Sequence, residues 1–317
     1  MAKTIRIVLF IFCVYLIAAP ARASEPQSPK VVVSIKPIHS LVAAVMQGVA
    51  EPQLLIKGGG SPHGYVLRPS EARSLANADL VVWVGQELES FLEKSLSTLG
   101  QNARQLKLAE ELESHLLPLR EGGSWEADVQ GHDDHKEHGE QDQHLWLDPQ
   151  LAQQIVGKTA AALAEIDPVH REQYEKNAAQ LKERLDSLHA QLKEKLTPVK
   201  DVPYVVFHDG YQYFEAAYGL NAVGSISIDP ERKPGARRIR EIRQKIKELH
   251  VRCVFSEPQF EPRLVTTVIE GTGAATGVLD PVGAELSAGP ESYFHLLNAL
   301  ADDLVAGLRQ ENPGIFK

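Results

Sequence analysis

The sequence contains little sulfur and no apolar run long enough to cross a membrane. Its 317 residues include two cysteines and two methionines, which excludes a disulfide-rich scaffold and a metal site built from thiolate or thioether ligands. The formal net charge is −9 and no basic run is present, so the chain is a poor candidate for binding nucleic acid. The apolar content of 43% is typical of a globular protein with a sizeable core, which excludes disorder for most of the chain.

The N-terminus has the form of a secretory signal peptide. Lys3 and Arg6 precede an uncharged apolar run at residues 7–19, and Ala21-Arg22-Ala23 is a cleavage site of the A-x-A type. A helix needs about 20 residues to span a bilayer, so this run is short for a membrane anchor, which is the alternative. We expect cleavage after Ala23 to remove residues 1–23. The exported chain then has 294 residues, a net charge of −12 and no stable membrane insertion.

Short apolar runs alternate with helical patterns along the rest of the chain. Continuous apolar runs are typical of strands buried on both faces of a parallel sheet. We expect strands at residues 30–35, 53–56, 80–84, 104–108, 202–207, 222–226, 251–255 and 275–279. We expect helices at residues 40–48, 70–78, 87–99, 149–166, 236–249 and 262–271. The predicted fold class is α/β, with two lobes that each contain a mostly parallel sheet flanked by helices.

A long helical pattern lies between the two groups of strands. Residues 169–196 contain no glycine or proline, and leucines recur there every three or four positions, which makes one apolar stripe. A helix of about 28 residues is about 40 Å long. We interpret it as a rigid helix that joins the lobes; a coiled-coil segment is the alternative. The predicted organisation is an N-terminal lobe at 24–148, a helical segment at 149–200 and a C-terminal lobe at 201–317.

An acidic, histidine-rich segment lies within the N-terminal lobe. Residues 131–144 contain five acidic residues and four of the twelve histidines, namely His132, His135, His138 and His144. Such a composition cannot build a core, so we expect a mobile loop. We favour weak, fast metal binding by His132, His135 and His138. A merely hydrophilic loop is the alternative.

Four residues at the ends of predicted elements are candidate metal ligands. His63 follows one strand, His144 precedes a helix, His208 ends a second strand, and Asp280 follows a third. Ligands of open α/β sheets bind outside the carboxyl ends of the strands, so two facing sheets would bring these side chains into one cleft. Three imidazoles and a carboxylate can complete a tetrahedral zinc site. A lone histidine at a strand end is more often structural, and Asp-Pro-x-Gly is also a simple turn.

The segments around these residues resemble the ZnuA-type family, the periplasmic zinc-binding proteins of high-affinity zinc ABC transporters. The matching segments run in order through nearly the whole mature chain: Ser34-Ile35-Lys36-Pro37, Ser61-Pro62-His63, Arg68-Pro69-Ser70, His144-Leu145-Trp146-Leu147-Asp148-Pro149, Phe207-His208-Asp209, Phe255-Ser256-Glu257-Pro258-Gln259-Phe260 and Leu279-Asp280-Pro281. The resemblance implies two α/β lobes bridged by a long helix, with a metal site in the cleft between them.

The resemblance also implies a ligand set. His63, His144 and His208 fall on the family's three metal-binding histidines. Manganese and iron relatives usually have glutamate at the third position, so His208 favours zinc, for which nitrogen is the better ligand. Asp280 matches an aspartate that ligates metal in related proteins and that water replaces in some zinc members, so the fourth ligand is Asp280 or water. Glu257 is a candidate acceptor that orients a ligand histidine; a turn role before Pro258 is the alternative.

The function implied is capture of Zn²⁺ in the periplasm and its delivery to the membrane permease of an ABC transporter, by a monomeric protein that is not an enzyme. Because neutral histidines are needed, the zinc affinity should fall as the pH drops toward about 6. One alternative is a manganese- or iron-binding protein of the same family. The other is an exported zinc hydrolase, since three histidines and a water also form catalytic zinc sites. The sequence lacks the H-E-x-x-H and G-x-S-x-G motifs of common hydrolases.

Overall fold

A computed structural model describes residues 28–120, 141–227, 230 and 234–310. Within these residues, eight strands form two four-stranded sheets in which every pairing is parallel. The first sheet has the order β2-β1-β3-β4 and comprises β1 (Val31–Val33), β2 (Gln53–Leu54), β3 (Leu80–Trp83) and β4 (Arg104–Lys107). The second has the order β6-β5-β7-β8 and comprises β5 (Tyr204–His208), β6 (Ala222–Ser227), β7 (Cys253–Ser256) and β8 (Ala275–Val278). The predicted α/β fold class is confirmed.

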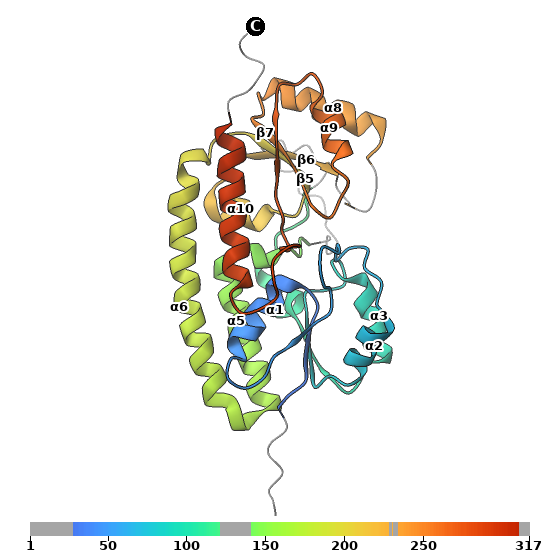
Figure 1. The fold of residues 1–317 in the computed structure, drawn as a ribbon, viewed down its shortest axis with the longest axis vertical. Coiled ribbons are helices and arrows are strands. Elements are labelled where there is room, and N and C mark those ends of the chain that lie inside the picture. Colours follow the sequence, from blue (N-terminus) through green and yellow to red (C-terminus); the bar gives the residue numbers. More distant parts are fainter. Residues whose placement is uncertain (1–27, 121–140, 228–229, 231–233, 311–317) are drawn as a thin grey trace, which may run out of the picture.

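Helices cover both sheets (Figure 1). They are α1 (Lys36–Val45), α2 (Pro69–Ala76), α3 (Ser90–Thr98), α4 (Leu108–Glu111), α5 (Pro149–Ile166), α6 (Arg171–Leu196), α7 (Gln212–Tyr218), α8 (Ala236–Glu248), α9 (Arg263–Ile269) and α10 (Ser292–Arg309). Helix α1 begins four residues before the predicted start, because Pro37 fits the first turn of a helix. The sequence analysis did not predict α4, α7 or α10. No helix in the described ranges is long and apolar enough to cross a membrane.

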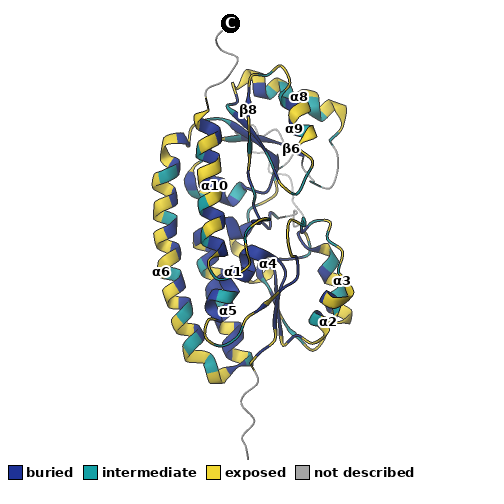
Figure 2. Ribbon diagram, viewed as in Figure 1, coloured by how far each residue is buried: buried dark blue, intermediate teal, exposed yellow. Residues whose placement is uncertain are grey.

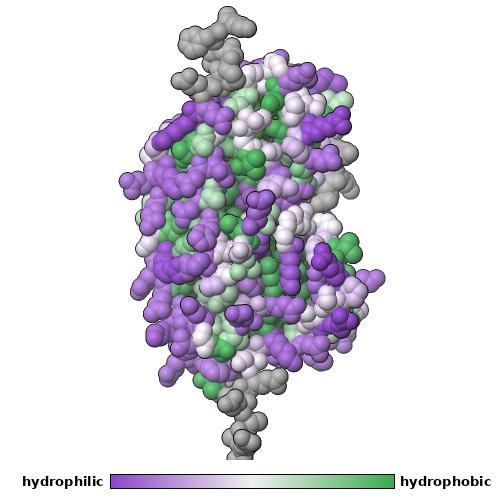
Figure 3. All heavy atoms as spheres, in the orientation of Figure 1, coloured by the Kyte–Doolittle hydropathy of each residue, from purple (hydrophilic) through white to green (hydrophobic). Residues whose placement is uncertain are grey.

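The long helix α6 runs beside both lobes (Figure 1). Its buried side chains include the predicted stripe Leu181, Leu185, Leu188, Leu192 and Leu196, and exposed residues follow its outer side (Figure 2). It contacts α1 and α5, which precede it in the sequence, and α7 and α10, which follow it. Hydrophilic side chains cover the molecular surface along it (Figure 3). The joining helix is therefore present as predicted, although it starts at Arg171, after a short 3₁₀ turn at Pro168–His170.

One continuous hydrophobic core connects the lobes. It includes Val33 and Val82 of the first sheet, Val206 of the second, and apolar residues of α1, α5, α6 and α10. This core includes residues on both sides of the predicted boundaries at 148/149 and 200/201. Those boundaries therefore remain predictions. The expected cleavage after Ala23 and the loop histidines His132, His135 and His138 lie outside the described residues.

Candidate metal centre

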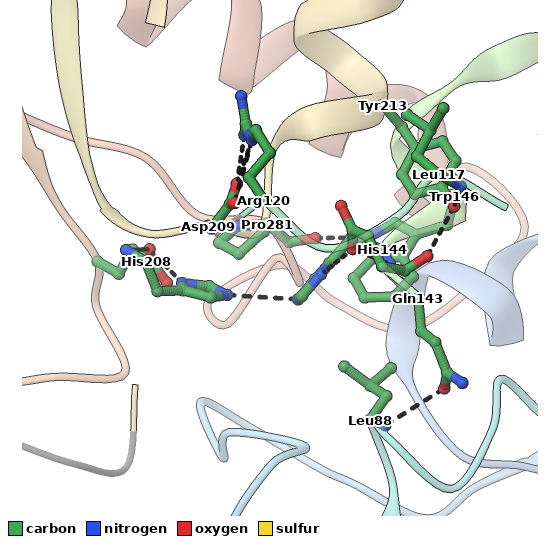
Figure 4. Close-up of polar contacts among 12 residues, drawn as sticks. Leu88, Leu117, Arg120, Gln143, His144, Trp146, His208, Asp209, Tyr213 and Pro281 are labelled. Carbon is green, nitrogen blue, oxygen red and sulfur yellow. Dashed lines mark hydrogen bonds and ion pairs between the residues drawn. The ribbon is translucent and has the colours of Figure 1, made fainter. Parts of the chain in front are cut away.

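Three histidines from distant parts of the sequence meet between the lobes. His63 lies in the loop between β2 and α2, His144 directly precedes a 3₁₀ turn that leads into α5, and His208 is the last residue of β5. One ring nitrogen from each histidine lies within 4.8 Å of the other two. Figure 4 shows the rings of His144 and His208 pointing toward each other. The structure thus places together three of the four residues expected in the cleft.

The ring protons determine what can lie between these rings. His144 Nδ1 is 2.7 Å from Asp142 Oδ1, and His208 Nδ1 is 2.6 Å from Glu257 Oε1. An ionised carboxylate only accepts, so each Nδ1 carries the proton and each Nε2 of a neutral ring presents a lone pair. These two Nε2 atoms nevertheless lie 3.3 Å apart. Two lone pairs facing at that distance require a cation or a shared proton between them.

The same distance matches a zinc site. Two nitrogens at about 2.0–2.1 Å from a tetrahedral Zn²⁺ lie about 3.3–3.4 Å apart. The third histidine has a free nitrogen as well, because His63 Nε2 is buried without a hydrogen-bond partner. Buried polar atoms are normally paired, so an unpaired one beside two facing lone pairs indicates a missing ligand. The donor set therefore fits a divalent metal ion.

Two carboxylates hold the rings in place. Asp142 accepts from both the backbone N–H and the ring Nδ1 of His144, and Glu257 accepts from the ring of His208 across the second sheet. Both carboxylates are buried. Glu257 was proposed from the sequence for this kind of contact, whereas Asp142 was counted only as one of the five acidic residues of the histidine-rich segment. Its position two residues before a candidate ligand histidine was the available signal.

Burial and neighbouring charges set the protonation of the site. Burial lowers the pKa of His63 well below its ordinary value, and the nearby His144 and His208 rings lower it further. Burial also acts to lower the pKa of His208, but the Glu257 carboxylate, with smaller contributions from Asp209 and Asp142, outweighs burial and raises it. His63 is thus neutral and ready to bind a metal, whereas a metal ion must compete with a proton at His208.

The fourth candidate, Asp280, is occupied elsewhere. Its Oδ1 accepts from Gln259 Nε2 at 2.8 Å and from the backbone N–H groups of Val282 and Gly283 at 3.2 and 2.9 Å. Its Oδ2 accepts from the backbone N–H of Ala284. Among the described residues, the group of converging ligand atoms contains the three histidines and not Asp280. In this structure the aspartate orders its own turn.

Two residues of the N-terminal half hold that turn. Lys36 Nζ donates to the carbonyls of Gly283 and Ala284, the latter at 2.9 Å, and Trp146 Nε1 donates to the carbonyl of Pro281 at 2.8 Å. These contacts cross between the lobes. They fix the turn of Asp280 beside the histidines rather than leaving it free to move.

The cavity between the histidines is very small. It measures about 10 Å³ and is lined by the three histidines together with Trp146, Phe260 and other residues of the two lobes. That volume corresponds to about one water-sized sphere. It accommodates an ion, and it is too small for an ester or peptide substrate.

An ion-pair cluster lies beside His208. Arg120 Nε donates to both carboxylate oxygens of Asp209 at 3.1 and 3.0 Å, and its Nη1 donates to Glu215 Oε2 at 2.7 Å. Figure 4 shows this contact next to the histidines. Burial raises the pKa of Glu215 to about 7, although Arg120 opposes the shift. The sequence analysis did not identify Arg120, because a contact between residues 89 positions apart leaves no local pattern.

Comparisons with known proteins identify the family of the chain. The family model described as the periplasmic component A of the zinc-uptake complex matches residues 31–307. The high-affinity zinc uptake system protein ZnuA of Brucella abortus is 45% identical over 322 residues, covering 93% of this chain and 96% of the relative. The ZnuA of Yersinia pestis is 35% identical over 294 residues, covering 89% and 92%.

Solved structures show the same architecture. A crystal structure of a ZnuA protein superposes with a TM-score of 0.75 at 25% identity and covers 89% of this chain and all (100%) of its own. The periplasmic zinc-binding protein TroA from Treponema pallidum has a TM-score of 0.75 at 22% identity, covering 90% and 100%. The latter similarity shows the fold alone.

Proposed function

The chain belongs to the ZnuA family of periplasmic zinc-uptake components, and we propose that it captures Zn²⁺ through His63, His144 and His208 and delivers it to the permease of an ABC transporter. The observation that carries the ligand assignment is the 3.3 Å separation of the Nε2 atoms of His144 and His208. In each ring the protonated Nδ1 donates to a carboxylate, which leaves the Nε2 lone pair for a metal ion. Zinc is favoured over manganese or iron because an all-nitrogen set suits Zn²⁺ better.

We propose that solvent supplies the fourth ligand. Turning the Asp280 carboxylate toward the ion would disturb the hydrogen bonds that it accepts within its own turn, and that turn is held by Lys36 and Trp146. An Asp280→Asn variant that binds zinc much more weakly, while folding normally, would reassign the fourth ligand to Asp280.

The way the ion is held explains how it can be given up. Three neutral imidazoles bind Zn²⁺ without neutralising its charge. Protons compete with the metal ion for the same nitrogens, so protonation of the ligands favours release. The cavity has no room for a substrate beside the ion. The family is described as a component of a zinc-uptake complex, not as an enzyme. We therefore propose that the protein catalyses no reaction. His132, His135 and His138 remain proposed weak sites that hold ions near the main one.

The family is described as periplasmic. We propose that cleavage after Ala23 releases a monomeric protein into the periplasm. The permease would receive the ion from the cleft between the lobes.

Calorimetric zinc titration tests the ligand assignment. A variant with His63, His144 and His208 all changed to Ala should lose one tight site and keep the weaker binding. The matched control changes three exposed histidines, His115, His250 and His295, to Ala and should keep the tight site. Tight binding that persists in the first variant would contradict the assignment. Competition at equal free concentrations of zinc, manganese and iron tests the choice of metal.

A further inference from the structure

Helix α8 concentrates positive charge in an otherwise acidic protein. Its 13 residues contain six cationic side chains and two carboxylates, a net charge of +4. The whole chain has a net charge of −9, so the other 304 residues carry −13. The metal site does not use this helix, which lies at the outer edge of the C-terminal lobe, on the side of the molecule opposite α6 (Figure 1).

Three of these cations form a stripe on one face. Arg240, Arg243 and Lys247 are spaced three and four residues apart, so they are neighbours on the helix surface. Together with Ile239, Gln244 and Glu248 they line a shallow hollow of about 500 Å³. A different face of the helix carries Ile242 and Ile246, which are buried in the lobe. Arg240 and Lys247 are exposed, and Arg243 between them is half-buried.

The carboxylates of α8 do not neutralise the stripe. Glu241 accepts from Arg237 at 2.7 Å, and Glu248 accepts from the amide of Gln244 at 2.7 Å. Arg243 donates to a backbone carbonyl, that of Glu270, and an uncharged carbonyl does not cancel the charge of the arginine. Within the described ranges, no carboxylate forms an ion pair with Arg240, Arg243 or Lys247. The three charges are available to an external anion.

We propose that Arg240, Arg243 and Lys247 dock α8 on the surface of a bilayer that contains anionic phospholipids. Cationic side chains near such a surface are attracted to it, and the effect of several adds up. The acidic remainder of the chain is repelled by the same surface, so the protein approaches it with α8 first. A bilayer offers phosphates at variable spacing. That fits three cations spread along an open hollow better than one folded acidic partner does, because such a partner needs a matched surface.

This surface goes beyond metal capture. It would concentrate the protein at the membrane and hold it with a fixed side toward the bilayer, whether or not the histidines carry a metal ion. Vesicle binding and zinc binding are separate measurements, so failure of one leaves the other standing.

Vesicle co-sedimentation of the purified exported protein tests the proposal. Vesicles of phosphatidylcholine and phosphatidylglycerol in equal amounts should sediment the protein at low salt, and vesicles of phosphatidylcholine alone should not. A variant with Arg240→Gln, Arg243→Gln and Lys247→Gln should bind the anionic vesicles about 100-fold more weakly. Binding should also weaken as added salt screens the charges.

The matched control removes the same charge elsewhere. Lys176→Gln, Lys193→Gln and Lys200→Gln neutralise three exposed cations on and just after α6, on the opposite side of the molecule. This variant should keep most of the vesicle binding, and both variants should bind zinc as the parent does. Equal losses in the two variants, or no binding to anionic vesicles at low salt, would overturn the proposal. So would displacement by inorganic phosphate at matched ionic strength, or binding to polyglutamate in place of vesicles.

Discussion

Arg120 and Asp209 form an ion pair between the two halves of the chain, in which Asp209 is buried and Arg120 half-buried, directly beside the candidate metal ligand His208. The guanidinium contacts both oxygens of the Asp209 carboxylate, and Asp209 immediately follows His208. Glu215 shares the same guanidinium at 2.7 Å. Removal of the arginine would leave two buried carboxylates without their cation, and the backbone that carries His208 would have to adjust.

We therefore expect Arg120→Ala to weaken zinc binding by about 10- to 100-fold, the range seen for partners behind metal ligands. Arg120→Lys should recover part of the loss, because lysine keeps the charge but not the planar fork. Chelator competition measures the affinity. Arg104, whose ion pair with Glu165 is partly exposed, is the control, and Arg104→Ala should bind zinc normally. Parent-like zinc binding by Arg120→Ala would show that the pair does not position His208.

A second prediction concerns the acceptor of His208. Glu257→Gln keeps the shape of the side chain and an acceptor oxygen but removes the charge, so the hydrogen bond to His208 Nδ1 weakens and the imidazole becomes a poorer ligand. Zinc affinity should fall about 10- to 100-fold. The control is Glu285→Gln, an exposed acid of the same lobe, which should leave the affinity unchanged. An equal decrease in both variants would indicate a long-range effect of charge instead.

A third prediction compares two glycines inside helices. A Cβ at Gly307 would lie 2.6 Å from Phe255 Cζ and 3.0 Å from Cys253 Sγ, both buried. Gly307→Ala should therefore destabilise the fold by about 1–3 kcal/mol. A Cβ at Gly157 would meet the flexible end of Lys182, 3.0 Å away at Nζ. Gly157→Ala should stabilise by up to about 1 kcal/mol, because alanine is the better helix former. Denaturant unfolding measures both, and the same sign for both changes would contradict the prediction.

A fourth prediction is a pH dependence set by Glu89. The residue is fully buried, and burial raises its pKa from 4.5 to about 7, although it accepts from the backbone N–H groups of Val84 and Gly85. The folded state therefore binds this proton more tightly than the unfolded state does. The resulting stability is complete below about pH 4.5 and is lost as the pH rises through about 7, in total about 3 kcal/mol.

Glu89→Gln should flatten that dependence, because glutamine cannot ionise. Unfolding of the metal-free protein and the variant at pH 5 and pH 8 isolates the contribution of this carboxyl, since the histidines titrate equally in both. A free-energy difference between the two proteins that stays constant with pH would rule out a raised pKa at Glu89.

The positions of the strands could be predicted from the sequence. Many contacts between side chains far apart in the sequence could not. Strands such as β3 and β5 are short, largely apolar and buried, and each of the eight strands lies within or overlaps a predicted range. Helix α10 was missed although Leu296, Leu300 and Leu304 recur at helical spacing and are buried. The start of α1 was displaced because Pro37 was not recognised as a first-turn residue.

The candidate site divides in the same way. His63 and His208 follow or end a predictable strand and His144 precedes a predictable helix, so their convergence could be expected from two sheets that face each other. Arg120 could not be found this way, because its partners Asp209 and Glu215 are brought near only by folding. Asp142 lies two residues before His144, and that signal was overlooked. The backbone hydrogen bonds of Asp280 are local, and its Asp-Pro-x-Gly sequence already allowed the turn that the structure contains.

The core that crosses between the lobes has a consequence for heat denaturation. Apolar residues of both sheets and of α1, α5, α6 and α10 belong to one cluster, so the unfolding of either lobe would expose core residues against which the other lobe packs. The described part of the molecule should melt as one cooperative unit in spite of its two sheets. Scanning calorimetry of the metal-free protein should show one peak, with equal calorimetric and van't Hoff enthalpies.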